Sequence, residues 1–232
     1  TGKYGVPDMA IVFTTASESA HIINWDGEAP VEPYGEPDLT KIHVFVLRDL
    51  KPDTTYAYQL DHDAPVSFTA PPVEGSLRFA VGSDAHYGAP KSDNDLTAAM
   101  LTRIADPANG YDAFFYLGDL VEYGFLNDQW RKAFTSLDTV TGSIPSAFTA
   151  GNHDTLFSGT GNYLDYCIPE MVLTQSPSRL WYRVDIGNAH FLVLDVEWSA
   201  ESVTNDQLQW LEGQLSSIPD DEWKIVMNHG FY

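Results

Sequence analysis

The sequence contains one cysteine, Cys167, among 232 residues. A lone thiol cannot form an internal disulfide or the paired-cysteine knuckle that holds structural zinc. Basic residues are also scarce: 12 Lys and Arg against 33 Asp and Glu give a net charge of −21. Such a surface argues against coating DNA or RNA, because nonspecific binding depends on neutralising phosphates. The longest apolar runs, such as 113–117, are far shorter than the roughly 20 residues of a membrane-spanning helix.

The composition is otherwise that of a globular chain, with 44% hydrophobic and 19% charged residues. Its length suits one large domain or two small ones, because domains usually run roughly 50 to 250 residues. The chain starts at Thr1 without a basic and then apolar leader, which indicates a processed or shortened form. One cysteine leaves the compartment open, and nothing in the sequence indicates the oligomeric state.

Residues 1–73 have the pattern of a small all-β module. Segments rich in β-branched and aromatic residues alternate with proline, glycine and aspartate, which favours an antiparallel sandwich. The expected strands are 9–15, 20–25, 41–47, 55–60 and 66–69. A complete sandwich of this type has about seven strands, so we expect a module that is truncated at its start. The proline-containing segment 70–75 predicts a stiff connector and a domain boundary.

Residues 76–232 alternate between strand and helix patterns. The expected strands are 77–81, 113–117, 147–150 and 224–227; the expected helices are 93–104, 126–137 and 205–215. A hairpin is expected from 181–186 and 189–194, turned by Gly187 and Asn188. This order predicts an α/β domain with a mixed sheet covered by helices.

Side chains that can bind metals follow four of these expected strands. They are Asp84 and His86 after 77–81, Asp119 after 113–117, Asn152, His153 and Asp154 after 147–150, and His229 after 224–227. Ligands of open α/β sheets bind beyond the carboxyl ends of the strands. We therefore expect these distant side chains to meet at one point.

The spacing and type of these residues indicate metal chemistry. Asp84 and His86 are two positions apart, and in an extended segment alternate side chains point the same way. Glycine precedes both Asp119 and Asn152, which allows a sharp turn and a close backbone approach. Carboxylate, amide and imidazole ligands suit Mn, Fe, Zn or Co. A carboxylate between two ligand sets can bridge two ions, and Asp119 is the candidate bridge.

Four motifs in order resemble the signature of calcineurin-like metallophosphoesterases. They are Asp84-Ala85-His86, Gly118-Asp119-Leu120-Val121-Glu122, Gly151-Asn152-His153-Asp154 and Val226-Met227-Asn228-His229. Segments 43–47 and 50–58 are similar to the fibronectin type III-like domain that precedes the catalytic domain of purple acid phosphatase-like proteins. The resemblance implies two β-sheets between helices, with a dimetal centre at one edge, preceded by a smaller immunoglobulin- or fibronectin-like sandwich.

The resemblance also implies a role for each matching residue. Asp84 and His86 would hold one ion, Asp119 would bridge, and Asn152 and His229 would hold the other. His153 would lie beside the substrate as proton donor or charge stabiliser, oriented by Asp154. With two ions of Fe, Zn or Mn, the implied reaction is hydrolysis of a small phosphate monoester or diester by a metal-bridging hydroxide.

Two departures from the family pattern stand out. Purple enzymes have a tyrosine three places after the Asp119 position, where this chain has Glu122, so we expect no purple chromophore. The closing GHxH motif does not occur, so we expect the domain over 76–232 to be truncated before it. The alternative to an enzyme is therefore a noncatalytic remnant or binding protein that retains the fold with an incomplete metal site.

The remaining polar candidates have weaker patterns. His21, His43, His62 and His190 lie outside any motif, and we expect them to be structural. Asp195 and Glu122 are candidates for contacts around the site, and Asn228 and Tyr232 for contacts with substrate. By analogy with the family, we expect an exported protein, periplasmic or extracellular.

Overall fold

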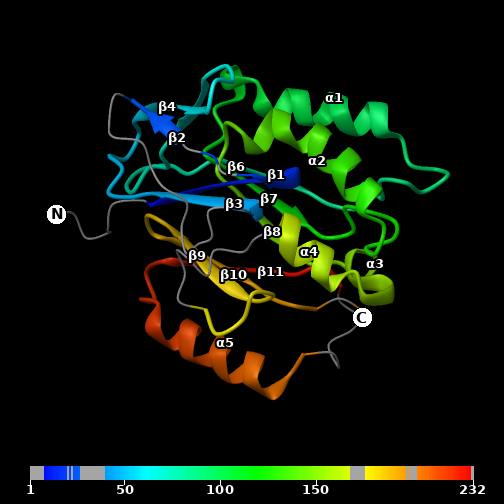
Figure 1. The fold of residues 1–232 in the computed structure, drawn as a ribbon. Coiled ribbons are helices and arrows are strands. Elements are labelled where there is room, and N and C mark those ends of the chain that lie inside the picture. Colours follow the sequence, from blue (N-terminus) through cyan, green and yellow to red (C-terminus); the bar gives the residue numbers. More distant parts are fainter. Residues whose placement is uncertain are drawn as a thin grey trace.

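The computed structural model describes residues 8–19, 21, 23–26, 40–167, 176–196, 198 and 203–230. Figure 1 shows sheets in the middle of the molecule, with helices on two sides. The elements in chain order are β1 (Met9–Ser19), β2 (Ile23–Trp25), β3 (Thr40–Leu47), β4 (Thr55–Leu60), β5 (Val66–Thr69), β6 (Phe79–Gly82), α1 (Asn94–Ala105), β7 (Ala113–Leu117), α2 (Asn127–Thr141), β8 (Ser146–Thr149), α3 (Asn152–Thr155), α4 (Thr160–Tyr166), β9 (Tyr182–Ile186), β10 (Ala189–Val193), α5 (Asn205–Ser217) and β11 (Trp223–Met227). Short 3-10 helices cover Pro107–Asn109 and Leu156–Ser158.

The five amino-terminal strands form two small antiparallel sheets. β1 pairs with β3, and β4 pairs with both β2 and β5. β1 continues to Ser19, beyond the expected end at 15, and the part of the expected strand 20–25 at residues 20 and 22 lies outside the described residues. The hydroxyl of Tyr56 accepts a hydrogen bond from the Lys51 amide at 2.9 Å, five residues upstream, as in a tyrosine corner. The likeness to a fibronectin type III domain stays a prediction.

The larger part of the fold has two sheets that face each other. β6, β7 and β8 form a parallel sheet, whereas β10 pairs antiparallel with β9 and parallel with β11. Phe114 and Tyr116 of β7 belong to the core that includes α1 and α2. Phe115 points the other way and stacks on Phe191 of β10, with ring centroids 4.3 Å apart. Because β7 is apolar on both faces, it is covered by helices on one side and by the second sheet on the other.

Helix α5 lies along the outer side of the β9–β11 sheet (Figure 1). The expected α/β architecture with helices outside the sheets is therefore confirmed. The single mixed sheet expected from strand order alone was wrong, because β6–β8 and β9–β11 are separate sheets among the described residues. Helices α3 and α4 were also not predicted, because glycines at 151, 159 and 161 interrupt the helical pattern there.

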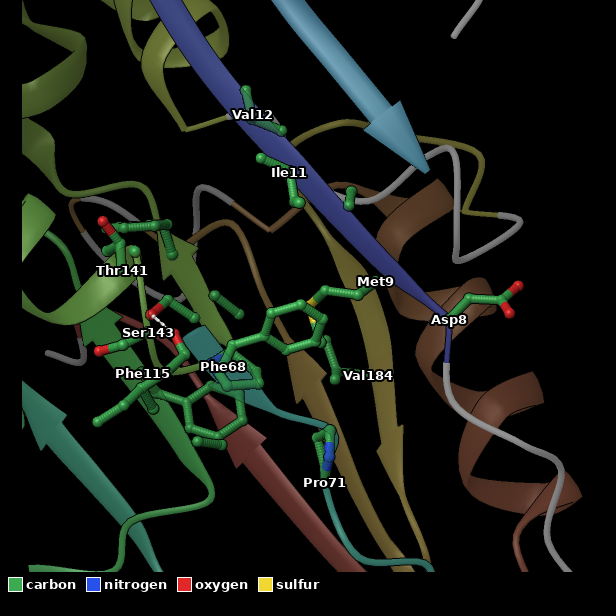
Figure 2. Close-up of a pocket in the computed structure, with 18 of the residues that line it drawn as sticks. Asp8, Met9, Ile11, Val12, Phe68, Pro71, Phe115, Thr141, Ser143 and Val184 are labelled. Atoms are coloured by element: carbon green, nitrogen blue, oxygen red, sulfur yellow. Dashed lines mark hydrogen bonds between the residues drawn. The ribbon is translucent and has the colours of Figure 1, made fainter. Parts of the chain in front are cut away.

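A large pocket lies between the amino-terminal sheets and the amino ends of β7 and β8. Its volume is about 1350 Å³, and Figure 2 shows Met9, Phe68, Phe115 and Val184 on its walls. None of the metal-capable residues at the carboxyl ends of the strands lines it. The metal-capable residues lie at the opposite, carboxyl ends of these strands. No helix in the described part of the chain has the length and apolarity to span a membrane.

Candidate metal centre

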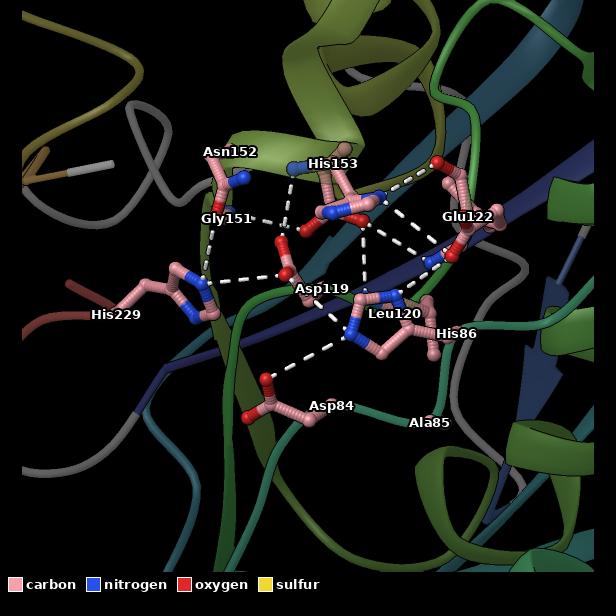
Figure 3. Close-up of polar contacts among 12 residues, drawn as sticks. Asp84, Ala85, His86, Asp119, Leu120, Glu122, Gly151, Asn152, His153 and His229 are labelled. Carbon is pink, nitrogen blue, oxygen red and sulfur yellow. Dashed lines mark hydrogen bonds and ion pairs between the residues drawn. The ribbon is translucent and has the colours of Figure 1, made fainter. Parts of the chain in front are cut away.

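The carboxyl ends of four strands bring the metal-capable side chains into one cluster, as Figure 3 shows. We call it the Asp119 cluster; its members are Asp84, His86, Asp119, Asn152, His153 and His229. Parallel strands β6, β7 and β8 end at one edge of their sheet, and the chain turns there into the three loops that carry five of these residues. His229 arrives two residues after the end of β11. The expected convergence of these distant residues is thus a feature of the fold.

Asp119 lies at the centre of the cluster and is buried. Its Oδ2 atom is 3.5 Å from His86 Nε2 and 3.3 Å from His229 Nε2. Its Oδ1 atom accepts a hydrogen bond from the His153 amide at 2.9 Å. Burial raises the pKa of the Asp119 carboxyl, but hydrogen bonds from the His229 ring and the His153 amide outweigh it, so that this pKa is lowered. The surroundings therefore favour the ionised, metal-binding form.

Two groups of three side chains around Asp119 have the spacing of a metal site. One is His86, Asp119 and His153; the other is Asp84, Asp119 and His229. In each group, ligand atoms lie within 4.8 Å of one another. Asp119 belongs to both groups, as expected of a bridge. Asp84 and His86 fall in different groups, however, whereas we expected them to share an ion.

Asn152 stands beside His229 at the edge of the second group. Its Oδ1 atom is 3.1 Å from His229 Nε2. The hydrogen bond with Asp119 raises the pKa of His229 to about 9, against the opposing effect of burial. Amide, carboxylate and imidazole atoms thus surround one point from three loops.

Asp154 has different contacts from those expected. Its carboxylate is buried and accepts hydrogen bonds from the amides of Leu120, Val121 and Gly151, at 2.9, 3.1 and 3.0 Å. Within the described residues, these hydrogen bonds go to backbone amides and not to the His153 ring, whose Nδ1 atom lies 2.8 Å from the Glu122 carbonyl oxygen. Burial raises the pKa of Asp154 to about 7, although the amides favour the ionised form. Asp154 therefore ties two loops together rather than orienting His153 directly.

The backbone around the cluster is unusual. Asp84, His86 and Asp119 have φ values of 59°, 46° and 53°, in the left-handed region that side chains rarely adopt. The extended geometry expected for the Asp84–His86 segment was therefore wrong, although both side chains face Asp119. Backbone strain of this kind persists only where the surroundings enforce it, and it is concentrated at functional sites.

Close approach of the loops explains the two glycines that precede the candidate ligands. A Cβ atom on Gly151 would lie 2.2 Å from the Asp119 amide nitrogen, and one on Gly118 would lie 2.7 Å from His229 Nδ1. Gly118 also has a φ of 83°. The expectation that these glycines permit close contact is confirmed.

The other polar residues that the sequence indicated lie partly beside the Asp119 cluster and partly elsewhere in the fold. Glu122 contacts His86 through its carboxylate, with Nδ1 to Oε2 at 3.0 Å. The backbone of Asp195 exchanges hydrogen bonds with the Gln207 side chain, and Asn228 donates to the Gly230 carbonyl. Tyr232 lies outside the described residues. His190 is buried, with its two ring nitrogens on Asp185 and Glu222, which fits the structural role expected for it.

Tyr116 helps to place the loop after β6, and the sequence did not predict this role. Its hydroxyl accepts a hydrogen bond from the Ala85 amide at 2.9 Å, between two of the candidate ligands. Burial raises the pKa of this phenol above its usual value. The hydroxyl distinguishes Tyr116 from the two phenylalanines of β7, but the sequence does not show which loop lies above it.

The donor set fits a pair of hard or borderline cations. Three carboxylates and three imidazoles lie together at Asp84, Asp119, Glu122, His86, His153 and His229. Within the described residues, no lysine or arginine forms an ion pair with these carboxylates. Oxygen and nitrogen ligands without thiolate suit Mn, Fe or Zn.

Comparisons with known proteins point the same way. The family described as calcineurin-like phosphoesterase matches residues 77–231. Purple acid phosphatase 21 of Arabidopsis thaliana is 26% identical over 212 residues, which cover 88% of this chain and 46% of that protein. Probable inactive purple acid phosphatase 1 of the same plant is 22% identical over 232 residues, covering 87% of this chain and 38% of that protein.

Among solved structures, purple acid phosphatase PPD1 from yellow lupin (Lupinus luteus) seeds has a similar fold, with a TM-score of 0.67 at 17% identity. The match covers 93% of this chain and 47% of that one. The chain therefore spans less than half the length of these relatives.

Proposed function

This chain belongs to the calcineurin-like phosphoesterase family, and from that premise we propose that it hydrolyses phosphate monoesters or diesters at the Asp119 cluster. The family uses dimetal centres, and the chain offers two groups of candidate ligands. The observation that carries the proposal is that both groups share the buried carboxylate of Asp119. One shared carboxylate could hold two cations close together, an arrangement that two-metal phosphatases use.

The proposed ligands are Asp84, His86, Asp119, Asn152 and His229, and the proposed metals are Fe, Zn or Mn. When bound, the cations would neutralise phosphate oxygens and lower the pKa of a water molecule. The carboxylates of Asp84, Asp119 and Glu122 would otherwise repel a phosphate anion. Cation binding by this chain should therefore precede substrate binding.

His153 is the proposed proton donor to the leaving alcohol. Its ring is partly exposed, and its Nδ1 atom is held by the Glu122 carbonyl oxygen at 2.8 Å. As an imidazolium, the ring has its other proton on Nε2, where the alcohol oxygen can receive it as the bond from phosphorus breaks. Water supplies the oxygen that replaces the alcohol. His153 also belongs to one candidate ligand group, so metal binding and proton donation are two separable roles for it.

The test is hydrolysis of p-nitrophenyl phosphate and bis(p-nitrophenyl) phosphate by the full chain with Mn²⁺, Zn²⁺ or Fe²⁺. Asp119→Asn should abolish turnover of either ester, and undiminished turnover would refute the shared-ligand role. The preferred ester distinguishes a monoesterase from a diesterase. His153→Ala should lower kcat with metal stoichiometry unchanged if His153 donates a proton, whereas loss of one bound ion would identify it as a ligand.

A second candidate function is a noncatalytic protein that retains the fold. It is favoured by three relatives whose names begin with Probable inactive purple acid phosphatase. In that case the full chain should turn over neither ester with any of the three metals. Metal content measured on the same sample would show whether the cluster binds cations without catalysis.

The amino-terminal residues 1–73 are proposed as a separate sandwich module of fibronectin type III type that serves as a scaffold, with 76–232 as the phosphoesterase domain. Its contacts with the larger part include the hydroxyl of Tyr58, which donates to the Gly142 carbonyl at 3.0 Å. Expression of 76–232 alone would test the boundary through its cooperative unfolding. Export to the periplasm or the extracellular space is proposed as well, and fractionation of producing cells would test it.

A further inference from the structure

The three histidine rings of the Asp119 cluster share one arrangement. His229 Nδ1 lies 2.8 Å from the Leu117 carbonyl oxygen, and His153 Nδ1 lies 2.8 Å from the Glu122 carbonyl oxygen. His86 Nδ1 lies 3.0 Å from Oε2 of the Glu122 side chain. Carbonyl and carboxylate oxygens accept hydrogen bonds, so each ring donates from Nδ1. A neutral ring held in this way has its lone pair on Nε2.

The Nε2 atoms of two rings face carboxylate oxygens of the candidate ligands. His86 Nε2 is 3.5 Å from Asp119 Oδ2 and 3.7 Å from Asp84 Oδ1. His229 Nε2 is 3.3 Å from the same Asp119 oxygen. A lone pair and a carboxylate oxygen that face each other attract only through a shared proton or cation. The fixed Nδ1 atoms therefore direct the opposite ring edges into the place where a cation would bind.

Glu122 holds two of these three rings, one by its side chain and one by its backbone. Its own position is set from both neighbouring loops, because its amide donates to the Tyr87 carbonyl at 3.1 Å and the Gly124 amide donates to the His153 carbonyl at 2.9 Å. The rings of His86 and His153 meet edge to face, with centroids 4.6 Å apart. Turning either ring would disturb the other.

We propose that Glu122 is the positioning residue of this site, and that its carboxylate fixes His86 in the Nδ1–H tautomer so that Nε2 binds the metal. The metal-binding part of this inference rests on the proposed function. The assignment of the Nδ1–H tautomer does not rest on the proposed function, because it follows from contacts within the chain. A hydrogen-bonded partner on the far ring nitrogen orients a histidine ligand and raises its basicity, and its loss typically costs 10- to 100-fold in metal affinity.

The first experiment reads the tautomers directly, from long-range ¹H–¹⁵N correlations of the imidazole rings in the full chain after chelation. In the wild type, His86 and His153 should both show Nδ1–H. In Glu122→Ala, His86 should change toward Nε2–H, the tautomer that free histidine favours. His153 should keep Nδ1–H, because its hydrogen-bond acceptor is the Glu122 backbone carbonyl at 2.8 Å, whereas the Glu122 carboxylate is 3.6 Å away. A His86 signal that is unchanged in Glu122→Ala would overturn the proposal.

Glu122→Gln keeps the proposal testable if the alanine variant disturbs the whole loop. The glutamine side-chain oxygen can still accept from His86 Nδ1, so Nδ1–H should be retained there. A glutamine variant whose His86 ring behaves as in the alanine variant would contradict the assignment. Glu212→Ala is the matched charge control, since Glu212 is an exposed residue of α5 outside the cluster, and its spectrum should equal that of the wild type.

The second experiment is a calorimetric titration of the same proteins with Zn²⁺. Glu122→Ala should bind about 10- to 100-fold more weakly than the wild type, and Glu122→Gln should bind close to the wild type. Equal affinity of Glu122→Ala and the wild type would overturn the positioning role. A wild type that binds no Zn²⁺ would contradict the proposed function instead, and the tautomer spectra would still decide what Glu122 does.

Discussion

Histidine lies between carboxylates in two regions of this protein: in the Asp119 cluster and around His190 in the second sheet. Around His190, Nδ1 is 2.8 Å from Asp185 Oδ1 and Nε2 is 2.7 Å from Glu222 Oε2. Arg183 adds a cation, with Nε 2.6 Å from Asp185 Oδ1. We call these four residues the His190 network. Its ring nitrogens and both of its carboxylates already have partners within the chain.

The Asp119 cluster differs from the His190 network in both charge and backbone. Ring nitrogens of His86 and His229 point at one carboxylate oxygen, and no arginine or lysine of the described chain pairs with it. His190 is a regular strand residue paired with Asp185 and Lys224, whereas Asp119 and His86 have left-handed backbones. Histidine and carboxylate alone therefore do not identify a metal site. The Asp119 cluster differs in that ring nitrogens are directed at a shared carboxylate with which no lysine or arginine of the described residues pairs.

The largest expected effect concerns the buried frame of the Asp119 cluster. Asp154→Ala would leave the amides of Leu120, Val121 and Gly151 without their acceptor. Each buried donor left unsatisfied costs about 1–3 kcal/mol, so for three donors we expect a loss of at least about 3 kcal/mol in the free energy of unfolding. Urea denaturation measures it. Asp154→Asn, which can still accept through its amide oxygen, should lose less. A loss below about 1 kcal/mol in the alanine variant would show that the amides find other partners.

The next prediction concerns the close contact between the Gly151 loop and the Asp119 loop. We expect the Asp119 cluster to depend on this contact, which the His190 network does not need. Gly151→Ala would place Cβ at 2.2 Å from the Asp119 amide and 2.3 Å from its Oδ1 atom. We expect about 3 kcal/mol of destabilisation from overpacking and weaker Zn²⁺ binding, measured by denaturation and calorimetry. Gly161→Ala is the control, since nothing lies within 4 Å of its Cβ position. Equal behaviour of the two variants would mean that the loops can separate without consequence.

Stabilisation by Zn²⁺ should depend on the Asp119 cluster and not on the His190 network. Zn²⁺ at 100 times its dissociation constant should stabilise the wild type by about 2.7 kcal/mol, because it binds the folded state. His190→Gln should lower stability and keep this increment, whereas Asp119→Asn should lose it. Thermal unfolding with Zn²⁺ and with chelator gives both quantities. If His190→Gln abolished the zinc increment, the distinction between the two regions would fail.

These features differ in how far the sequence could predict them. The strands before Asp84, Asp119 and Asn152 were predictable from apolar runs, and their parallel order places their ends at one edge. The glycines before Asp119 and Asn152 also led to a correct prediction, because the close approach of neighbouring loops leaves no room for a Cβ atom there. Strand order, the glycine turns and the residue types were enough to predict that the metal-capable side chains converge.

The finer arrangement could not be read in the same way. The partners of Asp154 are backbone amides, which any residue supplies, so no pattern identifies them. The left-handed backbones of Asp84 and His86 are not those of the extended segment that the spacing predicts. Glu122 reaches His86 and His153 only because the loops after β6 and β8 flank its own. These contacts depend on loop conformation, which composition and spacing do not determine.

The smallest effect lies within the His190 network, where two carboxylates hold the same ring with different exposure. The Asp185 side chain is 49% exposed, and that of Glu222 is 4% exposed. Water screens the first ion pair, so Asp185→Asn should change the free energy of unfolding by less than about 1 kcal/mol. Glu222→Gln should cost more, because a buried partner is replaced without water to compensate. Urea denaturation of the two variants measures the difference, and Zn²⁺ affinity should be unchanged in both. A larger loss in Asp185→Asn than in Glu222→Gln would mean that Arg183, rather than His190, depends on Asp185 for its place in the sheet.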